Sequence, residues 1–228
     1  MELFIDIETI PDQREGAFER IRQGITAPGQ YKKPESIAEW LRDNGDSEAE
    51  NQWRKTALDG GTGQVICIGY ACEDEAAQAI SRRLDQPEGD LLRAFNRAIG
   101  EALADRNEVD RQLTYIGHNA AGFDLPFLYK RFVVNGIKPR ARLFQNARPL
   151  SDNLFDTMSA WAGYGNRISL DNLCNALGIP SPKDGIDGSQ VWDFVQGGKI
   201  VEVAEYCKRD VEAVRTIYRR LNFLEVAA

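Results

Sequence analysis

The sequence predicts an α/β protein in which helices flank a mixed β-sheet. Residues 64–72 are almost continuously apolar, which is typical of a strand buried on both faces. Strands and helices alternate along the chain, without an internal repeat. A long final helix is expected over residues 199–221, because one apolar stripe runs along it at helical spacing: Ile200, Val203, Ala204, Cys207, Val211, Val214, Tyr218 and Leu221.

The first expected strand is short, over residues 2–7, and Pro11 ends it. Residues 12–60 are polar and contain few large apolar side chains, so they predict a helical insertion between two strands rather than an independent domain. We expect a single domain over residues 1–228. The insertion has helical patterns at residues 12–23, 34–44 and 47–58.

The remaining elements follow the strand at residues 64–72. A partner strand is expected at residues 76–84, an amphipathic helix at 90–104, a strand at 113–117, a helix at 125–135 that Gly136 ends, and a short helix at 169–177 that Gly178 ends.

Composition narrows the class of protein. The 228 residues include 35 acidic and 28 basic side chains, a net charge of −7, and 43% hydrophobic residues. These values indicate a globular protein and argue against disorder. The acidic balance disfavours a protein that grips nucleic acid through excess Lys and Arg alone, but it does not disfavour an enzyme that approaches phosphate through metal ions.

We expect a cytoplasmic protein without a membrane segment. The longest apolar run, residues 65–72, is much shorter than the ~20 residues of a membrane-spanning helix, and the N-terminus lacks the basic start of a signal peptide. The four cysteines form no CxxC pair, so a zinc site is disfavoured and buried, reduced thiols are expected.

Three segments carry candidate catalytic side chains. Asp6 and Glu8 lie two residues apart at a strand end, so both carboxylates face the same side. Asp124 begins a helix, where an acid is also a favourable cap. Tyr206 and Asp210 are four residues apart on the last helix and flank its buried face. Each segment alone is better explained by an ordinary structural role: a solvated strand end, a helix cap, and a half-buried Tyr beside a solvated Asp.

His118 is the only histidine. It lies in the loop before Asp124. We expect it to form a local hydrogen bond rather than to act as a ligand or a general base.

Taken together, the segments FIDIET, NAAGFD and YCKRD resemble the three exonuclease motifs of the DEDD 3′→5′ exonucleases. The expected contexts also agree: a strand end, a loop into a helix, and a late helix. The chain is most similar to stand-alone proteins that resemble the exonuclease domain of family B DNA polymerases, and the resemblance covers nearly the whole chain. It implies a ribonuclease H-like fold. Tyr206, four residues before Asp210, matches the tyrosine-type (DEDDy) branch, whereas the position diagnostic of the histidine branch holds Glu205.

The resemblance implies a catalytic set of Asp6, Glu8, Asp124, Tyr206 and Asp210. The four carboxylates are oxygen ligands suited to two Mg²⁺ or Mn²⁺ ions, and Tyr206 would orient the attacking water. The implied reaction removes nucleoside 5′-monophosphates from the 3′ end of single-stranded DNA.

Substrate contacts are also implied. Thr9 and Asn119 would contact the terminal nucleotide, and Phe123 would stack on a base, although a core position for Phe123 is equally expected. The basic side chains after the second motif would line a path for the strand or form a solvated face: Arg131, Lys138, Arg140, Arg142 and Arg148.

Alternatives remain open at the level of sequence. An RNA exonuclease would use the same carboxylates, and an inactive fold would serve as a binding or assembly module. The expected partner is single-stranded nucleic acid, DNA in preference to RNA, with a role in proofreading or DNA repair and a possible replication or repair partner protein. The insertion at 12–60 is equally suited to a lid, a strand guide or a partner surface.

Overall fold

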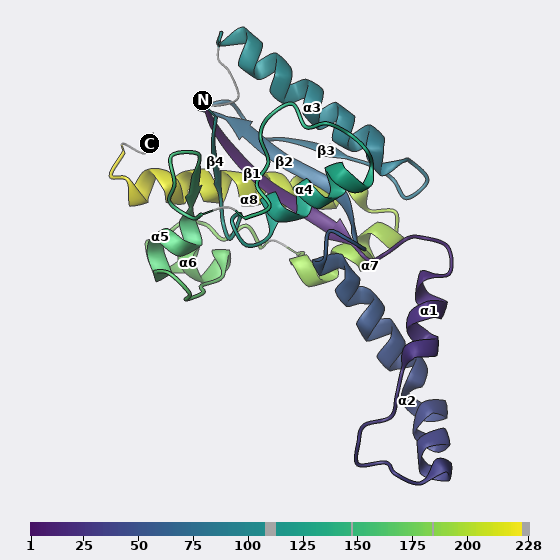
Figure 1. Ribbon diagram of the computed structural model, residues 1–228. Helices are drawn as coiled ribbons and strands as arrows, with labels where there is room; N and C mark the ends of the chain where they lie inside the picture. The colour runs from purple at the N-terminus through teal and green to yellow at the C-terminus, as the bar shows by residue number, and fades with distance from the viewer. Residues whose placement is uncertain (108–112, 147, 184, 225–228) are drawn as a thin grey trace.

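The computed structural model describes residues 1–107, 113–146, 148–183 and 185–224. Within these residues, one sheet has the strand order β3-β2-β1-β4-β5 and helices lie on both of its faces (Figure 1). Its strands are β1 Glu2–Ile10, β2 Gln64–Cys72, β3 Gln78–Ser81, β4 Thr114–Gly117 and β5 Leu154–Asp156. Strand β1 is central: it pairs antiparallel with β2 and parallel with β4. The mixed sheet predicted from the sequence is confirmed.

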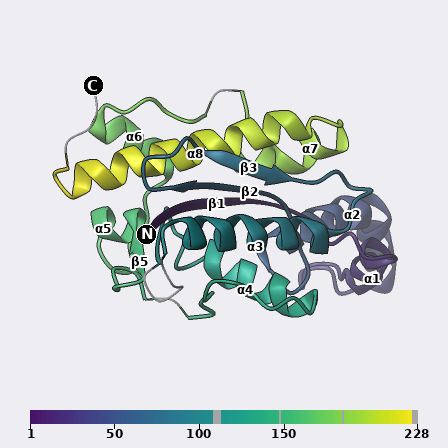
Figure 2. The ribbon, with the colours of Figure 1, turned by 90° about the horizontal axis from the view of Figure 1, so that it is seen from above.

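Two helical layers bury the sheet (Figure 2). Helices α3 and α4 cover one face, where Leu92, Phe95 and Leu128 are core residues. Helix α8, with α7 beside its start, covers the other face. The helices are α1 Ala17–Gly24, α2 Pro34–Lys55, α3 Glu88–Asp105, α4 Asp124–Val134, α5 Thr157–Ala162, α6 Leu170–Leu177, α7 Val191–Gln196 and α8 Ile200–Leu221, with 3₁₀ turns η1 Thr56–Leu58 and η3 Gly188–Gln190.

Most elements agree with the sequence-based expectations. β2 has the predicted bounds, and α8 buries the predicted stripe. β1 continues three residues beyond the expected end, to Ile10, which is fully buried. Three short elements were not predicted, namely β5, α5 and α7, because runs of 3 and 6 residues are too short to show a period.

Helices α1 and α2 pack together and project from the body as a helical arm (Figure 1). The two helical patterns at 34–44 and 47–58 are largely one helix, α2, which continues through Gly45. A Cβ at Gly45 would lie 2.7 Å from the Arg22 guanidinium. The missing side chain therefore leaves room for Arg22 from α1.

The base of the arm is fixed to the body. Trp53 Nε1 donates a 2.8 Å hydrogen bond to the Asp12 carbonyl oxygen. The Trp53 ring also packs edge-on against Trp192 of α7, with ring centroids 5.2 Å apart. Arg54 forms a 2.8 Å salt bridge with Asp193. These contacts hold the arm's base beside the end of β1.

No helix in the described part of the chain combines the length and the apolar character needed to cross a membrane. All four cysteines are buried free thiols, as expected.

Candidate active site

The structure brings the three motifs together at one site. Ligand atoms of Asp6, Glu8 and Cys207 all lie within 4.8 Å of one another. The charges of Asp124 and Asp210 act on both β1 carboxyl groups. We call Asp6, Glu8, Asp124 and Asp210 the carboxylate cluster. The prediction that Asp6 and Glu8 face the same side of β1 is confirmed.

A glycine in β2 allows α8 to reach this cluster. Gly69 pairs with Asp6 in the sheet register. A Cβ at Gly69 would lie 2.8 Å from Cys207 Sγ and 2.9 Å from the Cys207 carbonyl oxygen. Such contacts are too short for any side chain, so α8 packs directly on the β2 backbone. This approach carries Tyr206 and Asp210 to the end of β1.

Asp124 joins the first two motifs. Its carboxylate Oδ1 accepts a 3.1 Å hydrogen bond from the backbone N–H of Ile7, the residue between Asp6 and Glu8. Asp124 is the first residue of α4, and Phe123 occupies the cap position. The side chain is therefore turned to β1, and helix capping does not explain the acid at this position.

Burial and mutual repulsion perturb the cluster. Burial raises the pKa of Asp6 and of Glu8 well above the ordinary values, and the Asp210 charge adds to both shifts. Burial likewise raises the pKa of Asp124 and of Asp210 to about 7. Four acids in so small a buried volume repel one another unless cations or protons compensate them.

One atom of the cluster lacks any partner. Asp210 Oδ1 is buried and accepts no hydrogen bond within the described residues. Buried carboxylate oxygens are normally paired. The orphaned oxygen and the hard oxygen donors around it fit a divalent cation such as Mg²⁺ or Mn²⁺.

The Tyr206 hydroxyl is a neutral hydrogen-bond donor. The Tyr206 side chain is buried, and it forms a hydrogen bond with the Asp210 carboxylate. Burial and the nearby carboxylate charges raise the pKa of Tyr206 above its ordinary value, so the hydroxyl keeps its proton at neutral pH. The Arg209 guanidinium lies over the ring, 5.9 Å from its centroid. A half-buried Tyr beside a solvated Asp, the ordinary alternative for this pair, does not describe the site.

The predicted substrate-contact residues lie around the cluster in different ways. The Thr9 hydroxyl donates a 2.8 Å hydrogen bond to the Ala57 carbonyl oxygen, at the base of the arm. Asn119 has a φ of 63°, a left-handed conformation that Asn tolerates. Phe123 packs against the core and against Phe127, with ring centroids 5.4 Å apart. These contacts agree with the core position expected as the alternative for Phe123.

Two expectations need correction. His118 does not form a local hydrogen bond: its Nδ1 lies 3.0 Å from Thr157 Oγ1 and its Nε2 lies 2.8 Å from the Ile168 carbonyl oxygen, so it joins distant segments. Burial lowers its pKa. Arg131 cannot line a strand path, because it is buried and forms a 2.6 Å salt bridge with Glu88.

Two further residues belong to the site, although the sequence did not single them out as site residues. Asp156 is buried and accepts hydrogen bonds from the backbone N–H groups of Asn119 and Ala121, at 3.1 and 3.0 Å, so it shapes the loop before Asp124. The Cys207 thiol donates to Asp6 Oδ2 at 3.2 Å. The position of Cys207 inside the YCKRD segment could have indicated that it lies at the site. Nothing in the sequence distinguishes Asp156 from other acidic residues.

Comparisons with known proteins identify a family for this chain. Residues 64–227 match a family model described as "Predicted 3'-5' exonuclease related to the exonuclease domain of PolB". The matched range contains Asp124, Tyr206 and Asp210, whereas Asp6 and Glu8 precede it. No curated protein sequence matches the chain.

A solved structure has the same fold. It is the family B DNA polymerase from the hyperthermophilic archaeon Pyrobaculum calidifontis, with a TM-score of 0.57 and 14% sequence identity. The match covers 97% of this chain and 24% of the polymerase chain, so this chain corresponds to about a quarter of the polymerase. At this identity the likeness shows the fold alone, and it agrees with the ribonuclease H-like arrangement expected from the motifs.

Proposed function

Because the chain belongs to the family of predicted 3′–5′ exonucleases related to the exonuclease domain of PolB, we propose that it hydrolyses phosphodiester bonds at the 3′ end of single-stranded DNA. The products are nucleoside 5′-monophosphates. The observation that carries the proposal is the convergence of Asp6, Glu8, Asp124 and Asp210 in one buried cluster. The preference for DNA rests on the likeness to a DNA polymerase.

The cluster is the proposed site for two divalent cations, Mg²⁺ or Mn²⁺. Asp6, Glu8, Asp124 and Asp210 would hold these ions through their carboxylate oxygens, with Asp6 as the candidate shared ligand, Glu8 and Asp210 assigned to the ion that would activate water, and Asp124 assigned to the second ion. When bound, such ions lower the pKa of water and neutralise charge on the phosphodiester. The orphaned Asp210 Oδ1 and the raised pKa values of the acids support this assignment.

The protein's own residues supply positioning. Tyr206 keeps its proton and offers a hydroxyl that orients the attacking water. A separate side-chain base is not needed, and His118 is engaged with Thr157 and Ile168. These features favour the tyrosine-type branch of the DEDD exonucleases. Asn119, placed by Asp156, and Thr9 are the proposed contacts to the terminal nucleotide.

The test uses single-stranded DNA and RNA oligonucleotides, each labelled at the 5′ end, with Mg²⁺ or Mn²⁺. We expect a ladder that shortens from the 3′ end on DNA and more slowly on RNA. The ladder is absent with chelator and with Asp6→Ala. Faster degradation of RNA would reassign the substrate, and failure to degrade either polymer with any metal would refute the proposal.

A further inference from the structure

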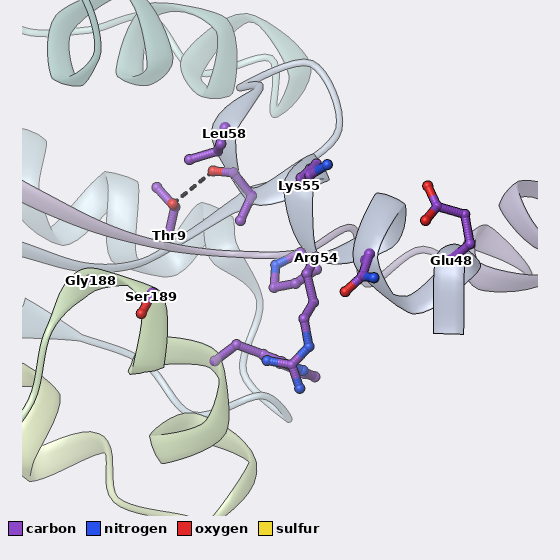
Figure 3. Close-up of a pocket in the computed structure, with 11 residues that line it drawn as sticks. Thr9, Glu48, Arg54, Lys55, Leu58, Gly188 and Ser189 are labelled. Atoms are coloured by element: carbon purple, nitrogen blue, oxygen red, sulfur yellow. Dashed lines mark hydrogen bonds between the residues drawn. The ribbon is translucent and has the colours of Figure 1, made fainter. Parts of the chain in front are cut away.

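A pocket opens between the base of the helical arm and the body (Figure 3). Its walls come from the end of β1, from the last turns of α2 with η1, and from η3 with the start of α7. Its volume is about 550 Å³, within the range of small-molecule sites. Thr9, the residue that follows Glu8, lies in the wall. In sequence, this wall residue is one position from Glu8 of the carboxylate cluster.

The arm presents a cation and an apolar side chain to this pocket. Lys55 is exposed and has no ion-pair partner within the described residues. Its neighbour Arg54 is different, because Glu50 and Asp193 both hold its guanidinium at 2.8 Å. Leu58 is 68% exposed, although large apolar side chains are usually covered. Figure 3 shows Lys55 and Leu58 on the arm side and Ser189 on the opposite wall.

An unpaired donor lies in the opposite wall. Trp192 lines the pocket, is 7% exposed, and its indole Nε1 has no hydrogen-bond partner within the described residues. Buried indole N–H groups normally find an acceptor. The Nε1 atom is itself covered, so this donor is not offered to the open pocket.

We propose that this arm pocket receives the terminal nucleotides of the single strand that enters the carboxylate cluster. Lys55 contacts a backbone phosphate, and a nucleobase packs on Leu58. Single-strand sites combine cations along the backbone with side chains, mostly aromatic, on which bases pack. Here the exposed aliphatic side chain of Leu58 is the proposed packing surface. Glu48 on the same wall disfavours phosphate near itself, which leaves the Lys55 end for the anion. This inference rests on the proposed exonuclease function and assigns strand binding to the helical arm.

The helix itself provides the matched control. Lys55 ends α2 and Lys33 immediately precedes it, so the two lysines lie about 30 Å apart along a helix of 22 residues. Both are exposed. Lys55→Gln and Lys33→Gln therefore change the net charge equally. Leu58→Ala is matched by Leu84→Ala, because Leu84 is an exposed leucine outside this pocket.

Kinetics on single-stranded DNA provide the first test. Lys55→Gln should raise KM about fivefold, change kcat by less than about twofold, and reduce the slope of log KM against log salt by roughly 0.7, as the loss of one phosphate contact requires. Leu58→Ala should raise KM about threefold without changing that slope. Lys33→Gln and Leu84→Ala should match the wild type. Equal effects of Lys55→Gln and Lys33→Gln would overturn the proposal, because they would indicate general charge attraction.

Binding provides a test that does not depend on turnover. Fluorescence anisotropy of a 5′-labelled single-stranded DNA, titrated with the protein in chelator, should show weaker binding for Lys55→Gln and Leu58→Ala than for the two controls. If the wild type degrades DNA but these variants bind and turn over normally, the pocket assignment fails and the exonuclease function stands. If the wild type degrades nothing but binding depends on Lys55 and Leu58, the pocket stands and the exonuclease function fails. Absence of binding by the wild type would refute the pocket.

Discussion

The backbone N–H of Ile7 donates a 3.1 Å hydrogen bond to Asp124 Oδ1, so the middle residue of the first motif holds the acid of the second. Asp124 therefore has two roles, one structural and one in the carboxylate cluster. Its oxygen satisfies a buried donor, and its charge belongs to the carboxylate cluster. The two roles respond differently to substitution.

Asp124→Asn should abolish exonuclease activity without destabilising the metal-free protein, because an amide oxygen still accepts from Ile7 and one repulsive charge is removed. Asp124→Ala should also be inactive but should lower the free energy of unfolding by about 1–3 kcal/mol, since the Ile7 N–H loses its partner. Denaturant unfolding in chelator measures both. Equal destabilisation by the two variants would show that the hydrogen bond contributes little.

Tyr206→Phe should lower kcat on the order of 100-fold, because a misplaced water reacts slowly. It should also lower the melting temperature, because the buried Asp210 carboxylate loses a hydrogen bond. Tyr218→Phe is the matched control on the same helix. The Tyr218 hydroxyl donates to Glu2 Oε1 at 2.5 Å, away from the cluster, so its loss should affect stability and not kcat. Full activity of Tyr206→Phe would exclude a role for the hydroxyl in orienting water.

Arg131→Ala should reduce the free energy of unfolding by roughly 3–5 kcal/mol, because Glu88 would stay buried without its cation. The basic side chains that follow the second motif in sequence are therefore not equivalent. Arg142 is exposed, so Arg142→Ala should change stability by less than about 0.5 kcal/mol. Thermal unfolding of both variants checks this, and a mild effect of Arg131→Ala would contradict the structural role.

The metal-free protein should lose stability as pH rises from about 4 to about 8. The pKa of Asp124 and of Asp210 is about 7 in the folded protein, whereas an unfolded Asp titrates near pKa ~3.9. Between these values the folded protein keeps protons that the unfolded chain has released, so the free energy of unfolding falls with rising pH. Denaturant unfolding in chelator across this range should show the decline, and Asp210→Asn should reduce it. Stability that rises over the same range would contradict the raised pKa values.

The long periodic elements and the motif residues could be predicted from the sequence, because burial on both faces of β2 and the stripe of α8 leave clear patterns. Features that depend on distant contacts could not. Asp156 looks like any strand-end acid until its distant partners at Asn119 and Ala121 are known. Gly69 looks like a weak point in a strand, yet it is the position where α8 approaches.

The role of Arg131 shows the same limit. Its neighbours in sequence suggest a basic surface, but its environment is set by Glu88, 43 residues earlier. The helical arm is a further case, since Gly45 in the middle of α2 leaves room for Arg22 from α1. In each case the decisive partner lies far away in the sequence, where spacing and periodicity carry no information.

The most direct measurement compares one DNA strand labelled at its 3′ nucleotide with the same strand labelled at its 5′ end, in a single time course with Mn²⁺. We predict that the 3′ label appears at once as a nucleoside 5′-monophosphate while the 5′-labelled strand shortens one nucleotide at a time, and that Asp6→Asn stops both. Release of the 3′ label in longer fragments, or cleavage that persists in Asp6→Asn, would contradict a 3′→5′ exonuclease built on the carboxylate cluster.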